Sequence, residues 1–563
     1  MNADQLLDLY DRVAEAPDAI PRLRRFVLDL AVRGKLVEQD AADEPASELL
    51  KRIAKEKLRL VTAGEIANPK MFPVLAVGGL SFTLPLGWEW SQISNIGIIS
   101  PRIRAADEAI ASFVPMAMIA AEYGSTNGHE ARPWGEIKKG YTTFGEGDVG
   151  LAKITPCFEN GKSTVFRGLT GGFGAGTTEL HVVRPIFVNP DYVVLFLKSP
   201  TFIENGIPRM TGTAGQKRVP TEYFAASPFP LPPFAEQHRI VAKVDELMAL
   251  LDRLEQARAG REALRDQLTA ATLNRLTQTD PEDFQPSAHF ALQTLSHLTT
   301  RPDQIKTFRQ TILNLAVRGK LVEQDAADTM VKLPASRKFS APSEWDVEVF
   351  EEFSRAFSLP FGWQVAPMAQ LSDHIVDCPH TTPKWTEKGE ICVRTNQLRA
   401  GTLDLSMPRY VSVETYLERI ERLEPEADDI LYSREGGILG MACRIPAGVR
   451  LCLGQRLMLV RAGNSVRADF LELVLNSPFI TEIARVKTTG GAAPRVNMST
   501  VRAYPIPLPP LAEQHRIVAR VEALMALCDQ LEAGLTQAAR TRTRLLDALL
   551  HAALHAAAPD AAA

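Results

Sequence analysis

Apolar residues recur at steps of four and three positions in two long stretches of the chain. They are Ile240, Val244, Leu247, Leu251 and Leu254 in the first stretch, and Ile517, Val521, Leu524, Cys528 and Leu531 in the second. This spacing is typical of the buried seam of a coiled coil. Pro232, Pro233 and Glu236 favour a helix start just before the first seam. The weaker pattern that follows extends to about Leu276, so we expect a helix of about 40 residues, or about 60 Å.

Shorter helices and mixed segments are predicted between these seams. A helical spacing of apolar residues occurs at Ile20, Leu23, Val27 and Leu30, and again at Ile305, Phe308, Ile312 and Leu315. Each of these helices precedes a long segment in which β-rich runs, glycine-rich turns and helical stretches alternate. The runs are His181 to Arg184 and Leu457 to Val460, the turns Gly171 to Gly176 and Gly490 to Gly491, and the helices Tyr192 to Lys198 and Phe470 to Leu475. The alternation predicts mixed α/β domains.

The chain is a tandem duplication. The segment LAVRGKLVEQDAAD at Leu30 recurs unchanged at Leu315, and LPPFAEQHRIVA at Leu231 recurs at Leu508 with one change. The segments between them have diverged almost completely, although both open similarly, with LPLGW and LPFGW. The tryptophans of these phrases, Trp88 and Trp363, are predicted to pack in the core. Similar frames around dissimilar segments indicate one architecture used twice.

This organisation predicts an α+β protein with two mixed α/β domains, the first insert and the second insert, joined by long antiparallel coiled-coil helices around a pseudo-twofold axis. The predicted regions are a helical region at 1–80, the first insert at 81–230, a central helical region at 231–356, the second insert at 357–507 and a C-terminal helix at 508–563. At roughly 150 residues per domain, 563 residues suit this arrangement.

Composition narrows the class of protein. Hydrophobic residues make up 45% and charged residues 23%, which is ordinary for a globular protein. The six cysteines form no CxxC pair, so neither a zinc site nor a disulfide framework is indicated. The first residues are acidic where a signal peptide would be basic, and no apolar run approaches 18 residues. We therefore expect a cytoplasmic protein with no membrane partner.

Several phrases in the inserts resemble the specificity (S) subunit of type I restriction-modification enzymes, over essentially the whole chain. In the first insert they are Asp148 to Lys162, Thr178-Glu179 and Gly215-Gln-Lys-Arg218; in the second they are Asp377 to Trp385, Asp429 to Gly436 and Gly454-Gln-Arg456. Both inserts close on LPPxAEQHRIV, the family's most characteristic phrase. The resemblance implies two target-recognition domains, each reading one half of a bipartite, asymmetric site in double-stranded DNA. It also implies two methylation subunits carrying S-adenosylmethionine and restriction subunits using ATP and Mg, with no cofactor in this chain.

Candidate DNA contacts follow from base and phosphate chemistry. The net charge is −4, but the inserts carry 0 and +1, so attraction to phosphates must be local. Arg and Lys suit phosphates and guanine, whereas Asn and Gln suit adenine. The candidates are Lys153, Asn160, Lys162, Thr178, Lys217 and Arg218 in the first insert, and His380, Lys384, Asn396, Gln397, Arg434, Arg456, Arg495 and Asn497 in the second. For any single cation, a solvated surface role is the more common alternative.

The repeated segments outside the inserts are candidates for subunit binding, because a pseudo-twofold frame offers two nearly equivalent docking surfaces. The candidates are Arg33, Lys35, Gln39, Glu236, Gln237 and Arg239 in the first copy, and Arg318, Lys320, Gln324, Glu513, Gln514 and Arg516 in the second. Two equivalent surfaces predict two copies of one methylation subunit.

Catalytic motifs are broken or missing in the sequence. Gly161-Lys-Ser-Thr164 lacks the first glycine of a phosphate-binding loop, since Pro156 stands there. The chain has no tetrapeptide like the NPPY or DPPY of amino-methyltransferases and no convincing acidic cluster for a metal nuclease. We therefore expect a non-catalytic subunit with no metal site. Two alternatives stay open: a coiled-coil scaffold whose inserts bind proteins, and a standalone methyltransferase that would bind S-adenosylmethionine by itself.

Overall fold

The chain forms two compact units, Met1–Arg261 with Ala539–Ala563 and Glu262–Ala538. The computed structural model describes residues 3–14, 16–68, 70–73, 82–213, 215–278, 286–287, 290–291, 293–294, 297–333, 345–355, 359–437, 439–489 and 494–555. The predicted insert starts at Ser81 and Phe357, and the predicted turn at Gly490 to Gly491, lie outside these residues. In the described part of the chain, no helix is long and apolar enough to cross a membrane.

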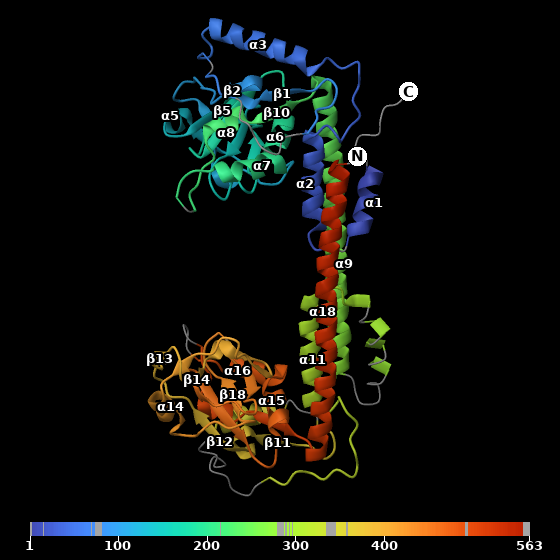
Figure 1. Ribbon diagram of the computed structural model, residues 1–563, viewed down its shortest axis with the longest axis vertical. Coiled ribbons are helices and arrows are strands. Elements are labelled where there is room, and N and C mark those ends of the chain that lie inside the picture. The colour runs from blue at the N-terminus through green and yellow to red at the C-terminus, as the bar shows by residue number, and fades with distance from the viewer. Residues whose placement is uncertain are drawn as a thin grey trace. The chain divides into compact units, whose positions relative to one another are not determined.

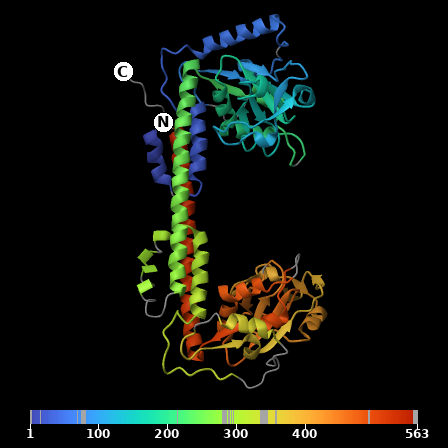
Figure 2. The ribbon, with the colours of Figure 1, turned by 180° about the vertical axis from the view of Figure 1, so that it is seen from behind.

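Two long helices contribute to both units, α9 (Phe234–Gln278) and α18 (Leu511–His555), and each has 45 residues. Each unit contains the first part of one long helix and the last part of the other, as an antiparallel pair requires. Figure 2 shows α9 as one uninterrupted helix that begins directly after Pro232 and Pro233. The predicted helix start and length are therefore confirmed.

The predicted seam is buried in α9 and incomplete in α18. Ile240, Val244, Leu247 and Leu251 are fully buried, whereas Leu531 on α18 is 55% exposed. The prediction of Leu531 as a seam residue was wrong, because apolar spacing does not reveal where the packing partner of a helix ends.

Shorter helices complete each unit; some lie along the long helices, whereas others, such as α3 (Ala46–Thr62), lie against an insert (Figure 1). In the first unit they are α1 (Ala3–Val13), α2 (Ala19–Val32) and α3 (Ala46–Thr62). In the second unit they are η4 (Pro302–Gln304), α11 (Ile305–Val317) and α12 (Val347–Ser354). The helices α2 and α11 are those that the periodicity predicts ahead of each insert. In α2 the four predicted apolar residues are all buried.

The first insert is a mixed α/β domain between two paired strands, β1 (Glu89–Gln92) and β10 (Pro228–Leu231). One four-stranded sheet has the order β2-β9-β6-β7 and the other has the order β4-β3-β8-β5. The other strands are β2 (Gly97–Ile99), β3 (Ile110–Val114), β4 (Glu130–Pro133), β5 (Thr142–Gly145), β6 (Val149–Ala152), β7 (Ser163–Val165), β8 (Phe173–Gly176) and β9 (Leu180–Pro185). The helices are α4 (Ile93–Ile96), η1 (Met116–Met118), α5 (Trp134–Ile137), η2 (Thr170–Gly172), α6 (Pro190–Lys198), α7 (Pro200–Gly206), η3 (Ile207–Arg209) and α8 (Thr221–Ala226).

The second insert has the same organisation between β11 (Gln364–Pro367) and β22 (Pro505–Leu508). Its four-stranded sheets have the orders β12-β21-β18-β19 and β13-β17-β14-β20, and β15 pairs with β16. The strands are β12 (Ser372–Asp377), β13 (Trp385–Thr386), β14 (Glu390–Val393), β15 (Leu398–Arg399), β16 (Thr402–Leu403), β17 (Tyr410–Val411), β18 (Ile430–Ser433), β19 (Ala442–Arg444), β20 (Leu451–Leu453) and β21 (Leu457–Ala462). The helices are α13 (Met368–Leu371), η6 (Thr395–Gln397), α14 (Val413–Ile420), α15 (Ala468–Leu475), α16 (Pro478–Val486) and α17 (Met498–Arg502).

The predicted turn at Gly171 to Gly176 was wrong for most of its length. Gly171 and Gly172 have positive φ and do turn the chain, but Phe173–Gly176 forms strand β8. A Cβ on Gly174 would lie 2.2 Å from the Ser112 carbonyl oxygen of the neighbouring strand β3. These glycines permit close strand packing, which composition alone does not distinguish from a turn.

Candidate nucleic-acid interface

An ion pair between a buried aspartate and a partly exposed arginine lies at the same place in both inserts. In the first, Arg184 on β9 donates to the Asp148 carboxylate at 2.7 and 2.9 Å; in the second, Arg461 on β21 donates to Asp429 at 2.8 and 2.7 Å. The Asp148 and Asp429 side chains are 1% and 2% exposed. Bidentate pairs of this kind fix both partners. They therefore align β6 with β18 and β9 with β21, residue by residue.

Two predicted DNA-contact residues, Lys153 and Arg434, lie at equivalent positions just after the aligned strands. Beyond β6 the carbonyl of Lys153 accepts from Val219 N–H at 2.8 Å, and beyond β18 the carbonyl of Arg434 accepts from Val496 N–H at 3.0 Å. Lys153 and Arg434 are therefore equivalent. They differ in setting, because Lys153 is half-buried whereas Arg434 is buried.

Each insert also ends a loop on an arginine. Arg218 exchanges two backbone hydrogen bonds with Thr211, at 2.8 and 3.0 Å, and Arg495 exchanges two with Thr489, both at 2.9 Å. Arg218 also bridges to Ile154, and Arg495 to Glu435. Arg218 and Arg495 therefore occupy equivalent positions in the two inserts. The sequence alone suggests another equivalence, because Gly215-Gln-Lys-Arg218 is more similar to Gly454-Gln-Arg456.

The residue that precedes the aligned strand reverses its charge between the inserts. Before β9 it is Glu179, which receives both branches of the Arg218 guanidinium at 2.8 Å. This arginine holds the pKa of the Glu179 carboxyl below its usual value. Before β21 the equivalent residue is Arg456, which is exposed and has positive φ. In the described part of the second insert, neither Arg456 nor Arg495 has an ion-pair partner.

Several second-insert candidates gather around Asp377. Arg434 Nε donates to its carboxylate at 3.1 Å, and His380 Nε2 lies 3.2 Å from it. Gln455 Nε2 donates to the His380 carbonyl at 2.9 Å. The three phrases that carry the family resemblance in this insert therefore meet at one place. Burial and pairing with Asp377 lock Arg434, whereas His380 is exposed.

The other candidates vary in accessibility. Asn160, Thr178 and Lys217 in the first insert, and Lys384, Asn396 and Asn497 in the second, are exposed. Lys162 is half-buried and donates to the Met116 carbonyl at 3.3 Å. Gln397 is 7% exposed; its amide oxygen accepts from Arg394 N–H and its nitrogen donates to the Asp404 carbonyl. These bonds occupy Gln397 in its own loop, whereas the exposed side chains are free to reach DNA.

The sequence analysis missed two arginines on the loop after β2. The register of β2 against β9 matches that of β12 against β21, so the loop carrying Arg102 and Arg104 corresponds to the one carrying His380 and Lys384. Both arginines are exposed. An Arg-x-Arg pattern is the signal that could have identified them.

The repeated residues of the frame attach each insert to its long helix. Glu236 is 1% exposed and accepts from Trp88 Nε1–H at 2.9 Å and from Gln39 Nε2 at 3.1 Å. Glu513 accepts from Trp363 and Gln324 at 3.0 and 3.2 Å. Burial raises the pKa of both glutamates. The tryptophans are therefore core residues, as expected, and also donate a bond that the sequence does not reveal.

Neighbouring residues extend these attachments. Gln237 and Gln514 are fully buried; they accept from the backbone N–H groups of Asn189 and Arg467, both at 2.8 Å. Arg239 and Arg516 bind Asp43 and Asp328 at 2.6 and 2.7 Å. Subunit binding by these residues and by their glutamate and glutamine partners stays a prediction, but internal bonding already explains why both copies carry them.

The two LAVRGKLVEQD segments make the same contact with the last turn of a long helix. Lys35 Nζ donates to the Leu554 carbonyl at 2.7 Å, and Lys320 Nζ donates to the Thr277 carbonyl at 3.0 Å. Each lysine therefore caps the C-terminus of a long helix, where a cation is favourable. A Cβ on Gly34 or Gly319 would meet Pro85 or Pro360 at 2.2 or 2.3 Å, so only glycine fits there. Of the remaining two candidates, Arg33 lies 3.2 Å from Asp29, and Arg318 ends α11.

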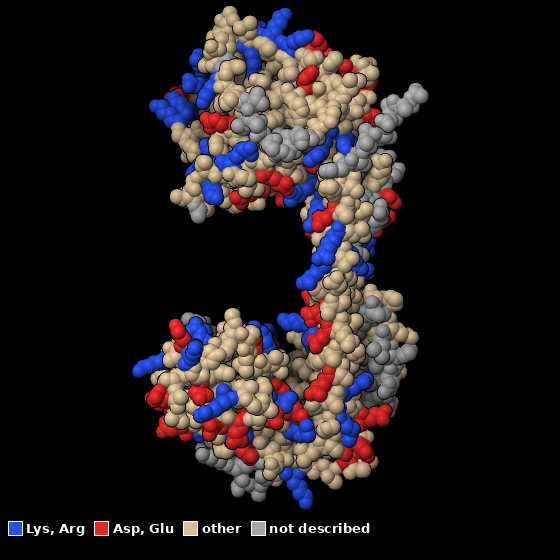
Figure 3. All heavy atoms as spheres, viewed as in Figure 1, with Lys and Arg blue, Asp and Glu red and all other residues tan. Residues whose placement is uncertain are grey.

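Metal ligation finds no support in this geometry. Within the described ranges, no group of three or more His, Cys, Asp or Glu side chains could hold a metal ion. What the inserts present instead is a set of exposed polar and cationic side chains on a shared framework. Figure 3 shows more Lys and Arg than Asp and Glu on the visible face of the first insert. The visible face of the first insert therefore suits a polyanionic partner.

Comparison with known proteins agrees with this interpretation. A family model described as the type I restriction modification DNA specificity domain matches residues 380–540. The chain is 36% identical to the type I restriction enzyme EcoEI specificity subunit of Escherichia coli, across 97% of this chain and 94% of the relative. It is 35% identical to the EcoAI specificity subunit of the same species, with the same coverage. A chain from a structure of type I R-M complex assembly shares the fold, with a TM-score of 0.50 and 19% identity over 84% of this chain and 99% of that one.

Proposed function

Because the chain belongs to the specificity subunits of type I restriction-modification systems, we propose that each insert reads one half of a bipartite, asymmetric sequence in double-stranded DNA. One observation carries the proposal: the framework pairs Asp148–Arg184 and Asp429–Arg461 are the same, while the residues at the other end of the same strands, Glu179 and Arg456, differ in charge. A shared scaffold with divergent exposed side chains fits two readers of different sequences.

The chemistry of reading is hydrogen bonding to base edges. Exposed amides such as Asn160, Asn396 and Asn497 can pair with adenine, while Arg456 and Arg495 can pair with guanine. Lys217 and Lys384 suit phosphates, which position the protein without reading sequence. Methylome sequencing of the host with and without this chain tests the proposal. A bipartite methylated motif that disappears with the chain is expected, and an unchanged methylome would contradict it.

The partners follow from the duplicated frame. Two nearly equivalent surfaces around α2 with α9 and α11 with α18 would bind two copies of one methylation subunit, and restriction subunits would join that complex. Mass measurement of the purified complex at saturation tests this stoichiometry. Two methylation subunits per chain are expected, and one stable subunit would count against it.

Catalysis is assigned to the partners, with S-adenosylmethionine bound by the methylation subunits and ATP with Mg used by the restriction subunits. The isolated chain would then supply recognition alone, in the cytoplasm where its DNA lies. Isothermal titration of the isolated chain with S-adenosylmethionine should give no heat, whereas saturable binding would favour a methyltransferase activity in the chain itself.

A further inference from the structure

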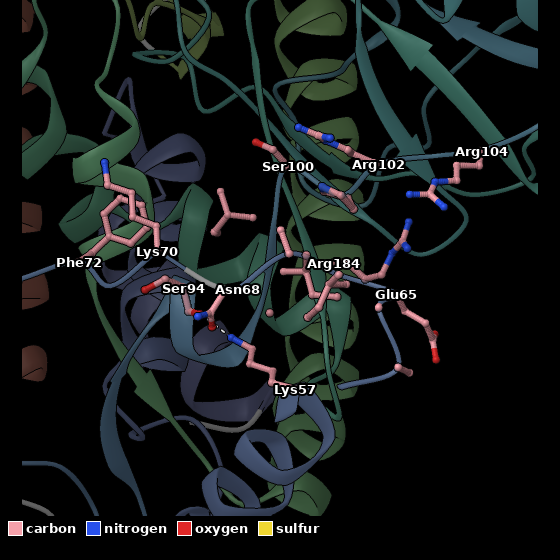
Figure 4. Close-up of a pocket in the computed structure, with 18 residues that line it drawn as sticks. Lys57, Glu65, Asn68, Lys70, Phe72, Ser94, Ser100, Arg102, Arg104 and Arg184 are labelled. Atoms are coloured by element: carbon pink, nitrogen blue, oxygen red, sulfur yellow. Dashed lines mark hydrogen bonds between the residues drawn. The ribbon is translucent and has the colours of Figure 1, made fainter. Parts of the chain in front are cut away.

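A wide cleft opens in the first unit between the end of α3 and strand β2. Its volume is about 920 Å³, and residues from both elements line it (Figure 4). Its charged residues are five cations and a single acid: Lys57, Lys70, Arg102, Arg104, Arg184 and Glu65. Asp148 pairs with Arg184 and Glu222 lies near Lys70, so among the described residues the positive charge without a carboxylate partner lies mainly on Lys57, Arg102 and Arg104 and favours a negatively charged occupant.

Other groups of the protein already contact three of the cations. Asp148 accepts two hydrogen bonds from the Arg184 guanidinium. Lys57 Nζ donates to the Ser94 carbonyl, and burial lowers the pKa of this amine to about 8. Lys70 lies 5.2 Å from the centre of the Phe72 ring and 3.8 Å from Glu222. Arg184 and Lys57 are therefore held in place, whereas Lys70 is exposed and only loosely paired with Glu222.

Arg102 and Arg104 differ from these three. Both are exposed, and within the described residues neither takes part in an ion pair. Their loop begins at Ser100, whose φ of +53° is uncommon for a residue other than glycine. Ordering side chains of this length costs conformational entropy, which a bound anion could offset. Because no described carboxylate pairs with Arg102 or Arg104, both guanidinium groups are available to such an anion.

The position of this loop points to the kind of anion. It corresponds to the loop after β12, which carries His380 and Lys384, because both leave the same strand of equivalent sheets. If the second insert presents its loop to DNA, the first insert presents Arg102 and Arg104 in the same way. Two exposed arginines without a carboxylate partner among the described residues suit phosphates, which need charge and no base-specific pattern.

Resting on the function proposed above, we infer that this cleft binds the sugar-phosphate backbone of DNA beside the first half-site, with Arg102 and Arg104 contacting phosphates. Lys57, whose amine donates to the Ser94 carbonyl, adds positive charge to the same cleft. The cleft thereby positions the first insert on the duplex without contributing to the sequence that it reads.

The test uses the complex with methylation subunits and two duplexes, one with the methylated motif and one without. Removing both charges with Arg102→Gln and Arg104→Gln should weaken binding to the two duplexes about equally. The slope of log affinity against log salt should fall by about 2, since each phosphate contact contributes about 0.9. The methylated sequence should stay unchanged.

Two further variants separate charge from folding. Arg102→Lys with Arg104→Lys keeps both charges and should retain the wild-type slope. Lys51→Gln with Lys55→Gln removes two exposed charges from α3 outside the cleft lining and should also leave the slope unchanged. A double glutamine variant with the wild-type slope would overturn the inference.

Two outcomes distinguish a wrong inference about the cleft from a wrong proposal about DNA reading. If the double glutamine variant releases a methylation subunit while its remaining complexes bind DNA with the wild-type slope, the occupant is an acidic protein surface and the inference is wrong. If the wild-type complex itself does not prefer the duplex with the motif, the proposed reading of DNA is wrong. The inference about the cleft is tested separately, by comparing the salt dependence of binding between the variant and the wild type on either duplex.

Discussion

The indole N–H of Trp88 donates a 2.9 Å hydrogen bond to the buried carboxylate of Glu236, at the start of the long helix α9. The second copy repeats it between Trp363 and Glu513 at 3.0 Å. Each bond joins the first strand of an insert to the first turn of a long helix. Together with the bonds of Gln237 and Gln514, this buried pair orients each insert on its own helix, which makes the contact a sensitive point for stability.

Removing the acceptor should destabilise the first unit. Glu236→Ala leaves the buried Trp88 N–H without its partner, at a cost of about 1–3 kcal/mol, whereas the exposed Gln39 amide keeps its bond to the Gly34 carbonyl. Glu236→Gln keeps an oxygen for Trp88 and should cost less. Denaturant unfolding of the full chain measures the difference, and Glu513→Ala with Glu513→Gln provides the matched comparison. An alanine variant as stable as the glutamine variant would show that the bond contributes little.

Stability of the first insert should fall in mild acid because of His181. Its Nε2 lies 2.9 Å from the Val219 carbonyl, and burial lowers the pKa of the ring to about 4. The folded pKa lies below the unfolded value, so between about pH 6.5 and 4 the unfolded chain binds a proton that the folded chain does not. Stability should therefore decrease as pH falls through this range, by up to about 3 kcal/mol.

The second insert supplies the control for this effect, because Met458 occupies the position equivalent to His181. His181→Met should flatten the loss of stability between pH 6.5 and 4, measured by denaturant unfolding across that range. The hydrogen bond to Val219 is lost at every pH, so only the slope against pH is diagnostic. A slope equal to that of the wild type would exclude His181 as the source.

The positive charge of Arg456, which stands where the first insert has Glu179, should contribute to DNA binding by the second insert. Arg456→Glu recreates the setting of Glu179, so the new carboxylate should pair with Arg495 as Glu179 pairs with Arg218. Losing these contacts should weaken binding to the target duplex by about 1–3 kcal/mol and reduce the salt slope by about 1 to 2.

Arg485→Glu, which changes an exposed charge on α16 that is paired with Glu482, is the matched control. The first half of the methylated motif should be unaffected by either variant. Wild-type affinity and salt slope in Arg456→Glu would remove Arg456 and Arg495 from the interface.

The sequence predicted the repeated architecture well, because heptad spacing marks the side of a helix that packs against a partner: Ile240, Val244 and Leu247 are all fully buried, and the pattern failed only beyond the packing partner, at Leu531. It predicted less about roles. The repeated residues Glu236 and Glu513 looked like docking residues because identity between copies does not say whether a partner is internal or external. The sequence did not single out Arg102, because its setting depends on strand register and on residues of α3 that are distant along the chain.

Helix length should set the spacing between the two half-sites. Four residues inserted after Gly260 lengthen α9 by about 6 Å, which equals nearly two base pairs. A matching insertion after Ala538 in α18 keeps the two helices in step, since both helices pass from one unit to the other near these positions. Both half-site sequences should persist, with a spacer longer by one or two base pairs and reduced affinity. An active complex with an unchanged spacer, found by methylome sequencing, would reject the helices as the determinant.

The central claim, that two separable domains each read their own half of the target, is tested most directly by exchanging one of them. The first insert, from β1 to β10, is replaced by the equivalent segment of another specificity subunit, and the methylated sequences of the host are then determined. One half of the motif should change to that of the donor, while the other half stays as it was. Alteration of both halves, or of neither, would contradict separate reading by the two inserts.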